Sequence, residues 1–340
     1  MQIIPIDEQY IHGAVSLEKD EFGCKPWRLP YDKITLYAKP LVQKAEMPAG
    51  VRVGLMSTTR QVHLTVVPND VERAFSCVID DELVETSVLA PGEEEVCFSN
   101  LKPENKRVEI YLPLNVPVIL RHLTIEPKTT YAPLPDDRPR MIAYGSSITH
   151  AVGSASPAQT WPALVARRWR LHLTSLGYGA QCHIEPMTAL MIRDLPADFI
   201  TLCLGINVIG QNSLSLRTCQ AAVIGMIRII REKHSDIPLV VQSPIYATDR
   251  EIVENKVGFT TVKMRAEILS AVSKLQEMGD ANLYYVDGLR IFGAEHKEFL
   301  ADKLHPNADG YCLMADNYER VVMEGLGIGR QLRSRKATNT

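Results

Sequence analysis

The spacing of apolar positions changes character about a third of the way along the chain. From about residue 27 to residue 126, apolar residues alternate with polar ones in short segments such as 51–56, 61–67 and 107–112, which Pro, Gly and Asn separate. Alternation with a period of two predicts half-buried antiparallel strands. We therefore expect an all-β sandwich, of a jelly-roll-like kind, in this first part of the chain.

The second part alternates between apolar runs and helical patterns. The runs lie at 141–144, 171–176, 199–204, 238–243 and 283–287, and the helical patterns at about 159–170, 215–234, 258–279 and 308–325. This order predicts an α/β domain, a parallel sheet with helices on both faces. Ligands of such sheets bind beyond the carboxyl ends of the strands, so candidate chemistry is sought directly after each run.

A stiff segment separates the two patterns, because residues 131–139 contain three prolines. We expect a β-sandwich domain over residues 1–132, a proline-rich linker over 133–139, an α/β domain over 140–329 and a basic, frayed tail over 330–340.

Composition and charge exclude several classes of function. Lys plus Arg number 37 and Asp plus Glu 40, which gives a net charge of −3, and no run of like charges indicates a nucleic-acid partner. The seven cysteines are scattered without a Cys-x-x-Cys pair, which argues against a disulfide framework and a zinc site. The histidines show no ligand spacing either, so we expect no metal and no organic cofactor.

The N-terminus lacks the basic stretch and apolar core of a secretory signal, and no apolar run reaches the length of a membrane span. We expect a soluble, cytoplasmic protein with a small-molecule or carbohydrate ester as its partner and no membrane partner. The sequence is compatible with a homo-oligomer and does not determine the oligomeric state.

The first candidate for chemistry is Ser147, in the segment Gly145-Ser146-Ser147 after the first parallel strand. A serine at a strand-to-helix turn lies at a helix N-terminus, which favours developing negative charge, and it can serve as a nucleophile. The alternative is a turn in which a serine hydroxyl only caps the next helix.

Two other strands end in groups that an oxyanion hole requires. Asn207 follows the third strand within Gly205-Ile206-Asn207, and Gly179 and Ala180 follow the second strand. A side-chain amide and free backbone N–H groups would then lie at the same edge as Ser147. The alternative is that these residues only make turns.

Asp302 and His305 precede the final helical pattern and are three residues apart, within Asp302-Lys303-Leu304-His305-Pro306. Together with Ser147 they complete the residue types of a Ser-His-Asp triad. The alternative is an ordinary surface loop. The conjunction of four such segments favours a serine hydrolase.

These four segments resemble the four sequence blocks of the SGNH, or GDSL-type, hydrolase family, over about residues 139–326. The resemblance implies a flavodoxin-like three-layer α/β/α fold and the hydrolysis or transfer of acyl groups. It also implies that Ser147 is the nucleophile, His305 the base and Asp302 its orienting acid. The oxyanion hole would comprise the Ser147 N–H, an N–H at Gly179 or Ala180, and the Asn207 side chain.

The chain departs from the family pattern at three positions. Ser146 and Val208 stand where the family usually has Asp, and Ala180 falls at the expected position of a backbone donor. Neither lost carboxylate is the triad acid, so the resemblance still implies the same mechanism.

The N-terminal part resembles the accessory sandwich of some carbohydrate esterases and some acyl-transfer enzymes. We therefore expect a serine esterase that cleaves acetyl or other short-chain esters of a carbohydrate or small metabolite. The alternatives are an acyltransferase with the same triad and a non-enzymatic binding module. We expect His150 and His183 to be wall residues or substrate contacts and Trp161 to be a core residue.

Overall fold

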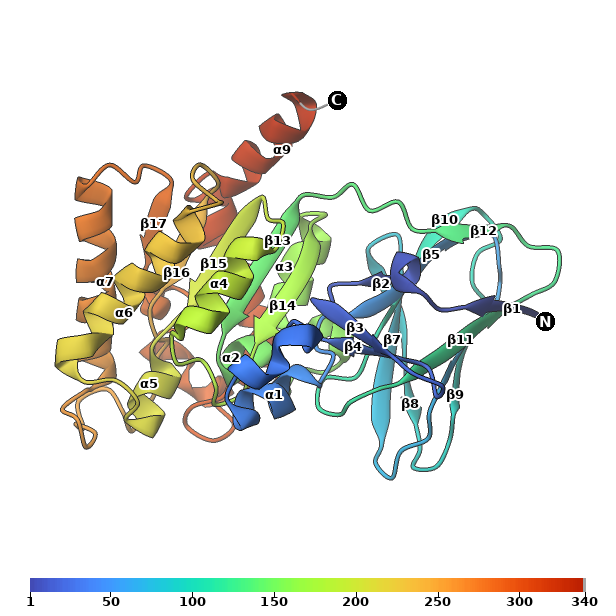
Figure 1. Ribbon diagram of the computed structural model, residues 1–340, viewed down its shortest axis with the longest axis horizontal. Helices are drawn as coiled ribbons and strands as arrows, with labels where there is room; N and C mark the ends of the chain where they lie inside the picture. Colours follow the sequence, from blue (N-terminus) through green and yellow to red (C-terminus); the bar gives the residue numbers. More distant parts are fainter. Residues whose placement is uncertain (339–340) are drawn as a thin grey trace.

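The computed structural model describes residues 1–338, which form an antiparallel β domain and a parallel α/β domain side by side (Figure 1). The strands of the first domain are β1 Gln2–Pro5, β2 Ile11–His12, β3 Ser16–Lys19, β4 Cys24–Trp27, β5 Arg52–Ser57, β6 Val62–Val66, β7 Arg73–Ile79, β8 Glu82–Leu89, β9 Glu95–Phe98, β10 Lys106–Tyr111, β11 Leu120–Ile125 and β12 Tyr131–Pro133. The strands begin earlier than the alternation predicted, because β1 to β4 are too short to show a period.

These strands form two sheets. One has the order β3-β4-β11-β6-β9 with β1 against β11, and the other has the order β12-β5-β10-β7-β8 with β2 against β5. Apolar side chains from both sheets share one core, including Val53 and Ile110 of one sheet and Leu64 and Leu123 of the other. The predicted β-sandwich is confirmed.

The second domain contains a five-stranded parallel sheet. Its strands are β13 Arg140–Gly145, β14 His172–Gly177, β15 Phe199–Cys203, β16 Leu239–Gln242 and β17 Leu283–Val286, in the order β14-β13-β15-β16-β17. This is the flavodoxin-like order, in which the chain reverses direction across the sheet beside β13. All five predicted strands are present. Four of them are mainly apolar, as buried parallel strands usually are, whereas β14 also contains Thr174 and Ser175.

Helices cover both faces of this sheet and complete three layers. The helices of the protein are α1 Lys39–Ala45, α2 Ser147–His150, α3 Trp161–Arg168, α4 Pro186–Asp194, α5 Ile206–Gln211, α6 Leu216–Arg231, α7 Thr261–Glu277, α8 Ala308–Tyr318 and α9 Ile328–Thr338. Short 3-10 segments lie at Glu8–Tyr10, Tyr31–Leu36, Pro157–Gln159, Gly288–Arg290 and Ala294–Phe299, and a π-helical turn at Glu319–Glu324.

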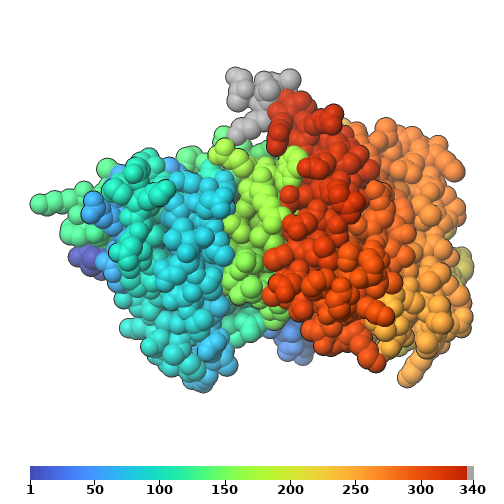
Figure 2. All heavy atoms as spheres, turned by 180° about the vertical axis from the view of Figure 1, so that it is seen from behind, coloured from blue at the N-terminus to red at the C-terminus, as the bar shows by residue number. Residues whose placement is uncertain are grey.

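Successive side chains of β13 enter different cores, as expected for a strand with a period of two. Ile142 and Tyr144 pack with residues of α4, α6 and α7. Met141 and Ala143 pack with residues of α3, α8 and α9. Figure 2 shows the second of these faces, where α3 (green) lies between the sandwich (cyan) and the C-terminal helices (red).

The C-terminal segment differs from the expected frayed tail. Residues 328–338 form α9, and Ile328 and Leu332 are buried against the α/β domain. Two apolar residues four positions apart give this basic segment one buried face. Residues 339–340 of the expected tail lie outside the described residues. In the described part, no helix is long and apolar enough to cross a bilayer.

Part of the N-terminal domain packs against the α/β domain. Leu41 and Ala45 of α1 belong to the same core as Tyr178 and Cys182, which follow β14. The polypeptide therefore places α1 beside the carboxyl edge of the parallel sheet (Figure 1).

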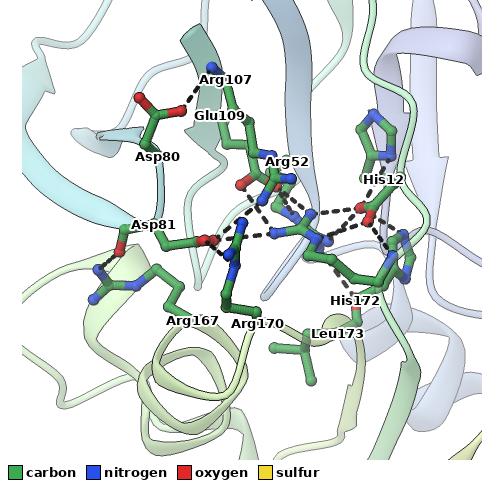
Figure 3. A network of polar contacts seen from close by, with 12 residues as sticks. His12, Arg52, Asp80, Asp81, Arg107, Glu109, Arg167, Arg170, His172 and Leu173 are labelled. Atoms are coloured by element: carbon green, nitrogen blue, oxygen red, sulfur yellow. Dashed lines mark hydrogen bonds and ion pairs between the residues drawn. The ribbon is translucent and has the colours of Figure 1, made fainter. Parts of the chain in front are cut away.

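A buried network of charged side chains joins the domains near the opposite edge of the sheet (Figure 3). Glu109, which is inaccessible to solvent, accepts hydrogen bonds from Arg52 at 2.7 Å and from Arg138 at 2.8 Å. Arg138 also pairs with Asp136, and both lie in the segment expected as a linker. The linker is therefore packed at the interface and fixes how the domains meet.

Candidate active site

Ser147 lies at the first position of α2, directly beyond the carboxyl end of β13. Ser146 is the N-cap, and its hydroxyl accepts a hydrogen bond from the Ile148 N–H at 3.2 Å. The departure from Asp at position 146 thus leaves a capping side chain in place. The Ser147 hydroxyl projects at a helix N-terminus, where the backbone dipoles favour negative charge.

The structure brings the three predicted triad residues together. The Ser147 Oγ lies 2.7 Å from the His305 Nε2, and the His305 Nδ1 lies 2.7 Å from the Asp302 Oδ2. These contacts have the order that acyl transfer requires, in which the acid orients the base and the base faces the nucleophile. The side chains of His305 and Asp302 are 35% and 57% exposed, so the base and acid lie at an open edge.

Hydrogen bonds within a short loop fix the positions of Asp302 and His305 relative to each other. The Ala301 N–H donates to the His305 carbonyl at 2.8 Å, and the Asp302 Oδ1 accepts from the His305 N–H at 2.7 Å. Burial acts to raise the pKa of Asp302, but the backbone N–H and the ring of His305 outweigh it, and the pKa is lowered. Asp302 is therefore ionised when it accepts a hydrogen bond from the His305 Nδ1–H.

Asn207 lies in the first turn of α5, beyond the carboxyl end of β15. Its Oδ1 accepts the Cys182 N–H at 3.0 Å, which fixes the amide and leaves the Nδ2 protons without another acceptor among the described residues. Gly205 has a φ of +106°, a conformation that favours glycine, and it turns the chain from β15 into α5. Val208, the other departure from the family pattern, is buried in the core.

The loop after β14 packs directly against α2. A Cβ on Gly177 would lie 2.2 Å from the His150 backbone nitrogen, so only glycine permits this approach. The Gln181 N–H donates to the Tyr178 carbonyl at 3.0 Å, and Ala180 between them has a φ of +61°. Within the described chain, the N–H groups of Gly179 and Ala180 have no hydrogen-bond acceptor. Both N–H groups therefore stay candidates for the predicted backbone donor.

The two neighbouring histidines differ in their contacts, and only His183 forms a hydrogen bond to this loop. His183 contacts the Ser213 hydroxyl at 2.8 Å through Nδ1 and the Ala180 carbonyl at 3.0 Å through Nε2. His150 is buried, and its Nε2 lies 2.6 Å from the Leu114 carbonyl. Burial, and next the Arg28 charge, lower the pKa of His150 to about 3, so its ring is neutral.

Trp161 is a core residue, as predicted. Its ring is inaccessible to solvent, and its Nε1 donates to the Ile148 carbonyl at 3.1 Å. It helps to hold the first turn after Ser147 and offers no surface to a sugar.

Sequence reasoning missed two basic residues at this edge, Arg28 and Lys44 of the N-terminal domain. Arg28 is fully buried and donates to the carbonyls of Gly177 at 2.6 Å and of Lys44 at 2.6 Å. The Lys44 stem lies against Gly179. No sequence pattern near Arg28 or Lys44 marks them as part of the site, so only their tertiary contacts show that they lie beside it.

In the described residues, one group of side chains has the geometry to hold a metal ion, and it lies between the domains rather than at Ser147. His12, Asp136 and His172 offer ligand atoms within 4.8 Å of one another. However, Asp136 is already hydrogen-bonded to Arg138, and the Arg52 Nη2 lies 3.7 Å from the same carboxylate. Two guanidinium charges would repel a cation here, so this donor set does not fit one.

The fold, and the contacts between Ser147, His305 and Asp302, have the arrangement expected of an esterase-like α/β enzyme with a Ser-His-Asp triad. The model of the GDSL-like lipase/acylhydrolase family matches residues 138–323, and the model of the SsfX3 N-terminal domain matches residues 9–121. The chain belongs to the GDSL-like lipase/acylhydrolase family.

Several solved structures share the whole two-domain arrangement. The salicylyl-acyltransferase SsfX3 from a tetracycline biosynthetic pathway is 30% identical, with a TM-score of 0.89, over 96% of this chain and 98% of that one. A putative GDSL-like lipase from Bacteroides ovatus is 19% identical, with a TM-score of 0.78, over 96% and 98% of the two chains. A family two carbohydrate esterase from Clostridium thermocellum, in complex with cellohexaose, is 14% identical, with a TM-score of 0.68, over 94% and 99%. No curated protein matches the chain.

Proposed function

We propose that the protein is an acyltransferase that moves an acyl group from an activated ester to an alcohol through an acyl-Ser147 intermediate. The observation that carries the proposal is the similarity to a salicylyl-acyltransferase, at 30% identity over 96% of this chain. This reverses the order of the two functions expected from sequence, in which hydrolysis came first.

In the first half-reaction the Ser147 Oγ attacks the acyl carbonyl while the His305 Nε2, 2.7 Å away, accepts the hydroxyl proton. The Asp302 carboxylate stabilises the imidazolium that forms. The carbonyl oxygen becomes an oxyanion, bound by the Ser147 N–H, the Asn207 amide and an N–H of Gly179 or Ala180. His305 then donates its proton to the leaving group, and acyl-Ser147 remains.

In the second half-reaction an acceptor alcohol occupies the place of the leaving group. His305 removes the hydroxyl proton, the alcohol oxygen attacks the acyl carbonyl, and the bond to Ser147 breaks. The proton on His305 returns to the Ser147 Oγ, so that the free enzyme and a new ester result.

Hydrolysis of small esters is the second candidate, and one observation favours it. With His305 35% exposed, water can reach the base and attack the acyl-enzyme in place of an alcohol. The similarity of the fold to carbohydrate esterases agrees with esters of a carbohydrate or small metabolite as substrates. The family membership applies equally to both candidates.

The test follows the fate of the acyl group. The purified protein is first treated with a small fluorophosphonate, and the adduct is located by peptide mass spectrometry, with His305→Ala as control. Short-chain and aromatic acyl esters are then supplied with and without alcohol acceptors. If the protein is an acyltransferase, the new ester should form faster than the free acid. If it is a hydrolase, the free acid should be released at the same rate with and without an acceptor. No adduct at Ser147 and no turnover would contradict both.

A further inference from the structure

A lysine of the N-terminal domain lies beside the loop that follows β14. The Cε and Cδ of Lys44 lie 3.7 and 3.8 Å from the position that a Cβ on Gly179 would occupy, and the His150 Nδ1 lies 3.7 Å from the same point. The lysine stem therefore forms a wall next to a proposed oxyanion donor. Figure 1 shows α1, which carries Lys44, close to α2.

The Lys44 ammonium has no carboxylate partner within the described residues. Glu46, the nearest acid along the chain, pairs instead with Lys25 at 2.7 Å. Glu185, on the loop that leads from Gly179 into α4, is coupled electrostatically to His183. Lys44 is half-buried, with its stem packed against Gly179, and its ammonium therefore has no fixed partner in the described part of the chain to compete with a substrate anion.

A second cation reinforces this charge. The Arg28 guanidinium is fully buried, and its donors all go to neutral carbonyls, those of Met47, Ser175, Gly177 and Lys44. Both positive charges act on His150, whose pKa they help to lower. Lys44 and Arg28 thus give this side of the site an excess of positive charge.

We propose that Lys44 is a specificity-determining residue that binds an anionic oxygen group of the substrate, such as a carboxylate or phosphate, next to the carbonyl that Ser147 attacks. The inference rests on the proposed acyl chemistry of Ser147 and names the class of substrate for it. An ammonium on a flexible stem can reach such a group, and pairing with an anion discriminates against neutral substrates. The anionic group can belong to the acyl group or to the alcohol.

Three chromogenic esters separate these cases. p-Nitrophenyl acetate is neutral, p-nitrophenyl hemisuccinate has an anionic acyl group, and the acetyl ester of a nitrophenol carboxylate has an anionic leaving group. The kcat/KM for each is measured with the wild type, Lys44→Met and Lys44→Arg. Methionine preserves an unbranched stem against Gly179 and removes the charge, and arginine restores the charge.

We expect Lys44→Met to lower kcat/KM for one of the two anionic esters by about 10- to 100-fold, as the loss of a charge-assisted hydrogen bond does. The rate with p-nitrophenyl acetate should change by less than about twofold, and Lys44→Arg should recover most of the loss. High salt should weaken the preference of the wild type for that ester, because mobile ions screen the attraction between the ammonium and the anionic group.

Two results would overturn the inference while the proposed function stands. One is a wild type that turns over the neutral ester and shows no preference for either anionic ester. The other is an equal loss on all three esters in Lys44→Met, which would mean that Lys44 only supports the loop or the oxyanion. A wild type that turns over none of the three esters and takes no fluorophosphonate at Ser147 would instead overturn both.

Discussion

The Arg28 guanidinium donates a hydrogen bond of 2.6 Å to the Gly177 carbonyl, and this contact joins the N-terminal domain to the last residue of β14. The same guanidinium donates to the Lys44 carbonyl at 2.6 Å, at the end of α1. One buried side chain therefore connects α1 to the loop that carries Gly179 and Ala180. The geometry of that loop depends on the sandwich domain as well as on the parallel sheet.

Replacement of Arg28 should affect both stability and activity. Arg28→Met leaves buried carbonyls without donors, and we expect it to lower the free energy of unfolding by roughly 3 kcal/mol or more. Arg28→Lys keeps the charge but lacks the planar set of donors, so it should recover only part of the loss. Thermal unfolding and turnover of a neutral ester measure the two effects. If Arg28→Met had the melting temperature and the turnover of the wild type, Arg28 would not support the loop after β14.

The Asp302 carboxylate should be needed for catalysis but hardly for folding. Asp302→Asn removes the charge that stabilises protonated His305 and can reverse the tautomer of the ring, so kcat should fall by about 10³- to 10⁴-fold. The melting temperature should change little, because the Asp302 side chain is 57% exposed. Asp309→Asn, in the first turn of α8, is a matched control outside the triad. A small effect of Asp302→Asn on kcat would exclude Asp302 as the orienting acid.

The Asn207 amide should act in the transition state. Removal of one oxyanion donor typically lowers kcat by about 10²- to 10³-fold, and we expect this of Asn207→Ala with little change in KM. Gln211→Ala is a suitable control, since the Gln211 amide donates to the Ala180 carbonyl at 3.2 Å at the exposed rim of the same loop. Normal turnover by Asn207→Ala would remove this residue from the mechanism.

The histidines between the domains should make the protein sensitive to acid. Burial, and next the Arg52 charge, lower the pKa of His12 to about 4 and that of His172 to about 2. A histidine in the unfolded chain titrates near pH 6.5. Below that pH the unfolded chain therefore binds protons at these two residues, while the buried rings of the folded protein stay neutral. Stability should fall as the pH drops from about 6.5 toward about 4, by about 2 kcal/mol per histidine at pH 5.

The carboxylates of the same network act in the same direction. The pKa of Glu109 is about 2 because Arg52 and Arg138 outweigh its burial, so its stabilising contribution is lost as the pH falls below the range of an unfolded glutamate. Melting temperatures between pH 7 and pH 5 check the histidine effect, since the carboxylate effect is larger below that range. His172→Gln removes one titrating ring and should give a shallower decline than the wild type. Parallel declines for the two proteins would contradict the assignment to His172.

The sequence allowed the parallel sheet to be predicted because most of its strands are largely apolar segments set between helical patterns, whereas α4 and α5 were missed. The short α5 begins within Gly205-Ile206-Asn207, and glycine and asparagine are typical of turns, so no helix was predicted there. The α4 helix begins at Pro186 and covers only nine residues, too few to show a helical period clearly.

The candidate triad was accessible to sequence reasoning because its chemistry is local. Asp302 and His305 lie in one short segment, and Ser147 stands at a strand end. The contact of Arg28 with Gly177 joins residues 149 positions apart, without a motif at either end. Such a pairing arises from packing between the domains, and a single sequence does not encode it in any nearby pattern.

The position of α1 has a consequence for how the chain can be divided. The connector at residues 133–139 is the obvious place to cut in an expression experiment, yet a fragment that begins there would lack Arg28 and Lys44. It would retain Ser147, His305 and Asp302 but lose the support behind Gly177 and Gly179. The boundary between the two architectures thus runs through the candidate site, and we expect the shortest fragment with a fully supported site to include both domains.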